Sequence, residues 1–188
     1  PPEAKDFMVK VGAKEVDEKS NRGRDAERHK IRTGYYTRLL NRISGITKTV
    51  YANRSPSKDH WLSGATGISA VYYNFNFLKN ALRVTIDFQR SEPEQNKYLF
   101  DHLASNKTSI EAEFGNPLVW LRLDDKISSR IQFETPFDSY EEDNWDEAIE
   151  WMNQHMDKLI NTIQPYLDNQ NPMYSMVLLQ KPAIGVVF

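Results

Sequence analysis

The sequence predicts an α+β fold, a two-layer sandwich in which helices pack on one mostly antiparallel sheet. Two observations support this prediction. Apolar and polar residues alternate in two segments, about 70–89 and 118–134, which is typical of strand pairs. Apolar residues recur at helical spacing in three others, about 24–43, 94–114 and 145–168, and indicate amphipathic helices. The order is therefore helix, hairpin, helix, hairpin, helix.

The first predicted helix places an apolar residue at every fourth position from Ile31 to Ile43. Its outer face is strongly basic, and we consider it a candidate for tracking a phosphate backbone. The arginines concerned are Arg24, Arg28, Arg32, Arg38 and Arg42. The alternative is a solvated helix face that the acidic segment 138–150 neutralises. The segment 44–68 is rich in Ser, Gly, Asn and Pro, so we expect a loop with one short strand at Thr47–Tyr51.

The two hairpins follow from alternation and from their turns. In the first, the apolar positions run from Val71 to Phe77 and from Leu82 to Phe88, with Lys79-Asn80 as a two-residue turn. In the second, Leu118–Leu123 and Ser128–Glu134 flank a polar turn.

The two later helices have clear ends. Gly115 stops the helix at 94–114, because glycine readily adopts the left-handed conformation that ends helices. The last helix carries an apolar stripe from Trp145 to Leu167, and Asn144 and Glu147 stand at the positions of a capping box.

Residues 24–168 are expected to form a single domain. We interpret 1–23 as a linker or the end of a preceding module, and 169–188 as an apolar, strand-like tail. Because the chain begins with Pro1-Pro2, we expect it to be part of a longer protein.

Composition excludes several kinds of site. The chain has no cysteine, so disulfides, thiolate metal sites and a cysteine nucleophile are excluded, and a reducing, cytoplasmic location is expected. No apolar run approaches the roughly 20 residues that span a bilayer, so we expect no membrane contact. Charge is distributed unevenly along the sequence. Between Lys19 and Asp59 there are eleven basic residues and three acids, whereas between Glu134 and Asp168 there are ten acids and one lysine.

The polar face of the hairpins is the candidate binding face. It would combine arginines, amides and aromatic rings, which can pair with phosphates and stack on bases. The candidates are Tyr72, Asn74, Arg83, Trp120, Arg122 and Arg130, with Asn76, Thr85, Asp87 and Gln132 on the same face. We expect a concavity open to solvent. The alternative is a solvated or helix-covered sheet face with cross-strand Arg–Asp pairs.

Catalytic chemistry has little support in the sequence. Asp87 could serve a metal-dependent nuclease together with Asp124 or Asp125, but these two lie in a predicted turn. The four histidines lack metal-ligand spacing. We therefore expect no catalytic residue, no metal and no cofactor.

Several short motifs resemble one family. They are Trp61 with Gly64 and Gly67, Ala81-Leu-Arg-Val84, Asn96-Lys-Tyr-Leu-Phe-Asp101, Ile110-Glu-Ala-Glu-Phe-Gly115, Leu118-Val-Trp-Leu-Arg-Leu-Asp-Asp-Lys126 with Ser129-Arg-Ile131, and Trp145-Asp-Glu147 with Glu150-Trp-Met152. Over about 35–165 the chain resembles an uncharacterised prokaryotic domain of unknown function. The resemblance implies a context, because such domains often follow a restriction-endonuclease-like module in DNA-defence proteins. It implies no active site.

Three hypotheses follow. The first is a non-catalytic domain of a DNA-processing or restriction-type defence protein, which binds DNA or RNA or contacts an upstream nuclease module. The second is a small metal-dependent nuclease. The third is a structural module that forms a homodimer through the apolar tail.

Overall fold

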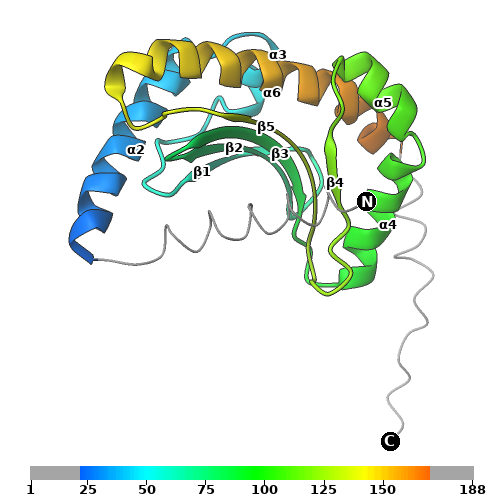
Figure 1. Ribbon diagram of the computed structural model, residues 1–188. Coiled ribbons are helices and arrows are strands. Elements are labelled where there is room, and N and C mark those ends of the chain that lie inside the picture. The colour runs from blue at the N-terminus through cyan, green and yellow to red at the C-terminus, as the bar shows by residue number, and fades with distance from the viewer. Residues whose placement is uncertain (1–21, 170–188) are drawn as a thin grey trace, which may run out of the picture.

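The computed structural model describes residues 22–169 (Figure 1). Its helices are α2 (Arg22–Arg42), α3 (Gly45–Val50), α4 (Pro93–Ala104), α5 (Lys107–Phe114) and α6 (Trp145–Asp168), and a short 3-10 helix, Glu142–Asn144, precedes α6. Its strands are β1 (Trp61–Ala65), β2 (Val71–Leu78), β3 (Ala81–Phe88), β4 (Val119–Leu121) and β5 (Ser129–Pro136). Within 22–169 no helix combines the length and apolar character needed to cross a membrane.

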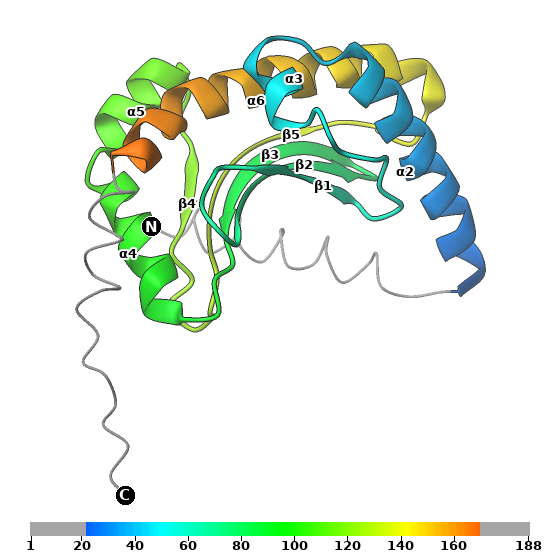
Figure 2. The same cartoon turned by 180° about the vertical axis from the view of Figure 1, so that it is seen from behind.

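The strands form one curved sheet in the order β1-β2-β3-β5-β4, and all four pairings are antiparallel. The predicted turn at Lys79-Asn80 joins β2 to β3, and β5 pairs along the other edge of β3. The two hairpins therefore lie side by side in one sheet. Helices α2, α3 and α6 lie over one face of it, and α4 and α5 lie at the end near β4 (Figures 1 and 2). The predicted α+β class is confirmed.

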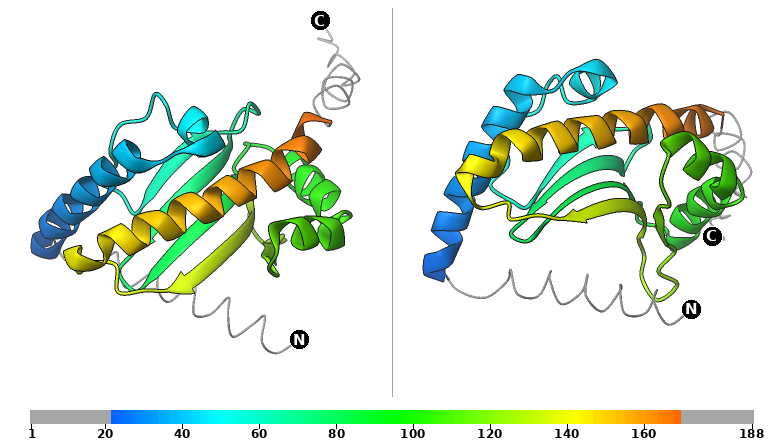
Figure 3. Two further views of the ribbon diagram at one scale, coloured as in Figure 1. Left: turned by 90° about the horizontal axis from the view of Figure 1, so that it is seen from above. Right: turned by 45° about the horizontal axis from the view of Figure 1, so that its top comes forward.

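The core lies between the sheet and α6, which crosses it diagonally when seen from above (Figure 3). Alternation along β2 and β3 turns fully buried residues such as Phe75 and Ile86 toward the helices. On α6, the apolar residues Met152, Met156 and Ile163 pack against this face of the sheet and are also fully buried. Each such side chain contributes about 1.5–3 kcal/mol when it leaves water.

Local departures from the predicted elements have physical causes. The helix expected at 94–114 is divided into α4 and α5, and at the break the Asn106 side-chain amide donates to the carbonyl of His102 at 3.0 Å. The strand expected at Thr47–Tyr51 was wrong, since this segment forms most of α3, and β1 was not predicted. The predictions for 1–23 and 169–188 fall, apart from residues 22, 23 and 169, outside the described residues.

His155 on α6 is partly buried among aromatic rings. Its ring stacks on Trp151 at 4.3 Å and on Phe133 at 5.1 Å between centroids, and Nδ1 lies 2.7 Å from the Trp151 carbonyl oxygen. Burial lowers the pKa of His155, the bond to Trp151 opposes this effect, and the charge of Lys158 reinforces it. The unfolded chain therefore binds this proton more readily than the folded chain does.

We predict that the free energy of unfolding falls as the pH drops through about 6.5, the ordinary histidine value, and continues to fall below it. Because glutamine does not titrate, His155→Gln should flatten this dependence between about pH 7.5 and 5.5. Urea denaturation at several pH values measures both slopes. An unchanged slope in the variant would show that His155 does not contribute.

Candidate functional site

The polar residues of β2, β3 and β5 share one sheet face, as predicted, and it is the face opposite α6. The register places them in three rows across the strands. The rows are Tyr72–Asp87–Arg130, Asn74–Thr85–Gln132 and Asn76–Arg83–Glu134.

Several of these side chains bind one another. Asp87 is 2% exposed, and its carboxylate accepts hydrogen bonds from Asn74 Nδ2 at 2.6 Å, from Arg130 Nε at 2.5 Å and from the Thr85 hydroxyl. Arg83 is fully buried, and its Nε donates to Glu134 Oε2 at 2.7 Å. The expectation of a face open to solvent is therefore wrong for Asn74 and Arg83. The cross-strand pairing foreseen in the alternative is observed, as Arg130–Asp87 and as Arg83–Glu134.

Two predicted members of this face lie elsewhere. Trp120 pairs with Ile131 in register, so it faces the helices, where its ring lies 6.0 Å from that of Phe100. Its Nε1 donates to a carboxylate oxygen of Glu111 at 2.9 Å. Arg122 follows the end of β4. The prediction assigned both to the wrong side because β4 is only three residues long, and a shift of one residue reverses the faces of a strand.

Arg122 has local carboxylate partners instead. Its Nε and Nη2 donate to the two carboxylate oxygens of Asp101 at 2.8 and 2.9 Å, and Nη1 donates to Asp124. Hydrogen bonding to Arg122 lowers the pKa of Asp101. Because Asp124 is bound here and Asp87 accepts three bonds on the sheet, neither carboxylate is arranged as an available metal ligand.

Most of the described arginines of α2 are also paired. Arg28 lies 2.5 Å from Asp25, Arg38 pairs with Glu142, and Arg42 pairs with Asp146. Arg32 is buried, and the side chain of Arg24 lies outside the description. The acidic segment before and within α6 thus pairs with Arg38 and Arg42, which agrees with the alternative foreseen for this helix.

A different basic segment, 46–61, carries unpaired charge. Lys48 on α3, and Arg54 and Lys58 on the loop after it, are exposed and form no ion pair within residues 22–169. The segment ends at Trp61, which is 44% exposed and lies edge-on to His60 at 4.8 Å. The segment therefore carries three exposed cations and one accessible indole, and the pairing of Trp61 with Asn76 places the indole on the polar side of β1.

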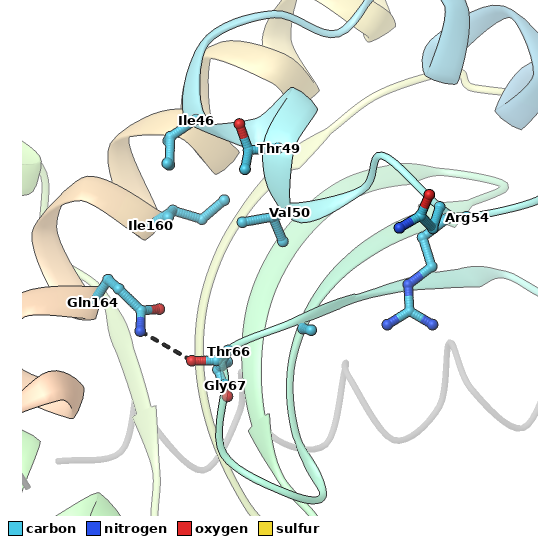
Figure 4. A pocket seen from close by; sticks show the side chains of 10 residues that line it. Ile46, Thr49, Val50, Arg54, Thr66, Gly67, Ile160 and Gln164 are labelled. Carbon is cyan, nitrogen blue, oxygen red and sulfur yellow. Dashed lines mark hydrogen bonds between the residues drawn. The ribbon is translucent and has the colours of Figure 1, made fainter. Parts of the chain in front are cut away.

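An open pocket of about 660 Å³ adjoins this segment. Figure 4 shows Val50 of α3 and Ile160 of α6 pointing toward one another, with Arg54 at the end away from α6. The remaining lining residues are Ile46, Thr49, Asn53, Ala65, Thr66, Gly67 and Gln164.

Close contacts hold α3 in place. A Cβ at Gly64 of β1 would lie 2.6 Å from Val50 and 2.7 Å from Tyr51, so only glycine lets the helix approach this strand. Gly45, at φ +64°, sits against Asp157 of α6, where a Cβ would lie 2.5 Å from a carboxylate oxygen. The same oxygen accepts bonds from the backbone N–H and the hydroxyl of Thr47, both at 3.1 Å.

The Asn96-Lys97 motif also has a structural role. Lys97 Nζ donates to the carbonyl oxygens of Arg122, Leu123 and Ser128 at 2.6–2.8 Å, so it binds both sides of the β4–β5 turn. Asn96 Nδ2 donates to the Ile127 carbonyl in that turn at 2.8 Å. Burial lowers the pKa of Lys97.

Across residues 22–169, the fold and contacts define an α+β domain with one antiparallel sheet and with α2, α3 and α6 over one face. A family model described as "Domain of unknown function (DUF4268)" matches residues 31–167, and the chain belongs to this family. Neither the curated proteins nor the solved structures include a match to the chain.

Sequence reasoning missed the 46–61 segment as a site, although it counted its basic residues. Ion pairing separates this segment from α2, since Arg38 and Arg42 are exposed as well but have carboxylate partners. Those partners lie far along the chain: Arg42 and Asp146 are 104 residues apart. The local signal was Trp61, a large apolar residue amid polar loop residues, and it was noted only as part of a family motif.

We predict that Asp87→Ala lowers the free energy of unfolding by roughly 3 kcal/mol or more, because it leaves Arg130, Asn74 and Thr85 without their acceptor. The matched control, Asp101→Ala, removes an exposed pair and should change stability little. Urea denaturation compares the two variants. Equal losses would contradict the central role of Asp87 on the sheet face.

Proposed function

We propose that this chain is a non-catalytic recognition domain that binds single-stranded nucleic acid through the 46–61 segment. The observation that carries the proposal is the exposed indole of Trp61 at the end of a loop with unpaired cations. Single-strand binders combine these elements, since cations follow the phosphates and aromatic rings stack on unpaired bases.

The charge distribution favours this segment over α2. The formal net charge of the whole chain is −2, so attraction to a polyanion depends on a local excess of basic residues. Arg38 and Arg42 already pair with acids of the same chain, and binding a phosphate would require breaking those pairs. Binding a phosphate at Lys48, Arg54 or Lys58 would not require breaking an ion pair among residues 22–169.

The biological context is part of the proposal. The resemblance to domains that accompany restriction-endonuclease-like modules suggests a DNA-processing or defence protein, in which this domain would hold a strand for a neighbouring nuclease. Single-stranded DNA is therefore the first ligand to test, and RNA of the same sequence is the second.

We predict that a labelled single strand binds more tightly than a duplex, with affinity that falls steeply with salt. Trp61→Ala should weaken binding by about 1–3 kcal/mol through lost stacking. Lys58→Ala should lower the slope of the log–log salt dependence by about 0.7 for each lost phosphate contact. Fluorescence anisotropy at several salt concentrations measures both effects.

Ile127→Ala and Lys126→Ala are the matched controls. Ile127 is 56% exposed and Lys126 is exposed, and both lie in the β4–β5 turn, away from the 46–61 segment. Absence of binding at about 50 mM salt would refute the proposal. Cleavage of the strand with magnesium, lost in Asp87→Asn, would support the nuclease alternative instead.

A further inference from the structure

We infer that the pocket between α3, the loop after β1 and α6 accepts one nucleotide, with its base at the α6 end and its phosphate at Arg54. The inference rests on the proposed function and adds a specific subsite to it. Its basis is the separation of apolar and cationic groups along the pocket (Figure 4).

The α6 end offers an apolar surface for a flat ring. Val50 and Ile160 point toward one another, and Ile46, which is 38% exposed, extends this surface toward solvent. A solvent-exposed isoleucine next to a concave apolar wall is a contact that a ligand would complete, because covering it removes apolar area from water.

The opposite end offers free polar groups. Thr49, Asn53 and Arg54 follow one another at the end of α3, and in the described part of the chain their side chains make no hydrogen bond. The backbone that carries them is fixed by the Arg54 N–H, which donates to the Tyr51 carbonyl at 3.0 Å. A guanidinium matches a phosphate with two parallel bonds, and a side-chain amide can pair with a base edge.

A third wall, formed by Gln164 of α6 and the loop after β1, already has its hydrogen bonds and is therefore preformed. The Gln164 amide donates to the Thr66 carbonyl oxygen and to Asp168, each at 2.9 Å, and its oxygen accepts from the Tyr73 hydroxyl at 3.0 Å. Gly67, at φ +87°, continues this wall, and a Cβ there would meet nothing within 4 Å. Ligand binding thus requires little rearrangement on this side.

The size of the pocket agrees with the ligand. Its volume of about 660 Å³ lies within the roughly 300–1,000 Å³ typical of small-molecule sites. An anion suits it better than a neutral ligand, because Arg54 has no carboxylate partner within residues 22–169.

The test is a titration of the full isotope-labelled chain, followed by NMR, with nucleoside monophosphates, the matching nucleosides and inorganic phosphate. We expect shifts in α3, in residues 65–67 and around Ile160 for the monophosphates. Nucleosides and phosphate alone should bind roughly tenfold or more weakly, since each makes half of the contacts. Equal shifts from phosphate alone would overturn the base subsite.

Two variants with matched controls locate the ligand. Ile46→Trp fills the pocket from its exposed side and should abolish monophosphate binding, whereas Ile127→Trp should not. Arg54→Ala should weaken it roughly tenfold to a hundredfold, as expected for a charge-assisted contact, whereas Lys126→Ala should not. Thermal melting verifies that each variant folds. Monophosphate binding that survives Ile46→Trp in a folded protein would overturn the inference.

The same variants separate this inference from the proposed function. If oligonucleotides bind wild type and Ile46→Trp equally, and monophosphates produce no shifts, the pocket inference fails while strand binding stands. If monophosphates bind in the pocket but no strand binds, the site takes free nucleotides and the proposed function fails.

Discussion

The close approach of α3 to β1 and α6 is the constraint on which the candidate site depends. Gly64 leaves room for Val50 and Tyr51 against the strand, and Gly45 leaves room for Asp157 of α6. Asp157 then bonds to Thr47, so one carboxylate fixes the first turn of this short helix. A six-residue helix is not stable by itself, and these contacts replace the missing length. They also create the pocket, since α3 supplies one wall and α6 and the loop after β1 supply the others.

The second organising feature is the distribution of charge. Arginines of α2 and of the sheet meet carboxylates within the chain, and the two most buried of these pairs, Arg83–Glu134 and Arg130–Asp87, lie on the sheet. Such buried networks fix strand register and orientation because each member needs its partner. In the loop after α3, Arg54 and Lys58 form no ion pair with an acid of residues 22–169. Arg54 and Lys58 are therefore available to an external anion, and the function proposed for the chain follows from this contrast.

Sequence periodicity predicted the fold well where the elements are long. The α6 stripe and the β2–β3 hairpin followed directly from spacings of about 3.6 and 2 residues. It failed at β1, where Trp-Leu-Ser-Gly-Ala includes a glycine and has only Leu62 as a buried apolar side chain. It also failed for Trp120, because three residues are too few to define a register. Which arginines are paired could not be predicted, since Arg38 finds Glu142 across 104 residues.

The central claim is that the 46–61 segment, and neither the arginines of α2 nor those of β3 and β5, is the recognition surface. Hydrogen–deuterium exchange of the full chain, with and without a saturating single-stranded oligonucleotide, tests it most directly. We predict slower exchange in residues 46–67 and unchanged exchange in α2. Protection confined to α2 or to β3 and β5, with 46–67 unaffected, would contradict the claim.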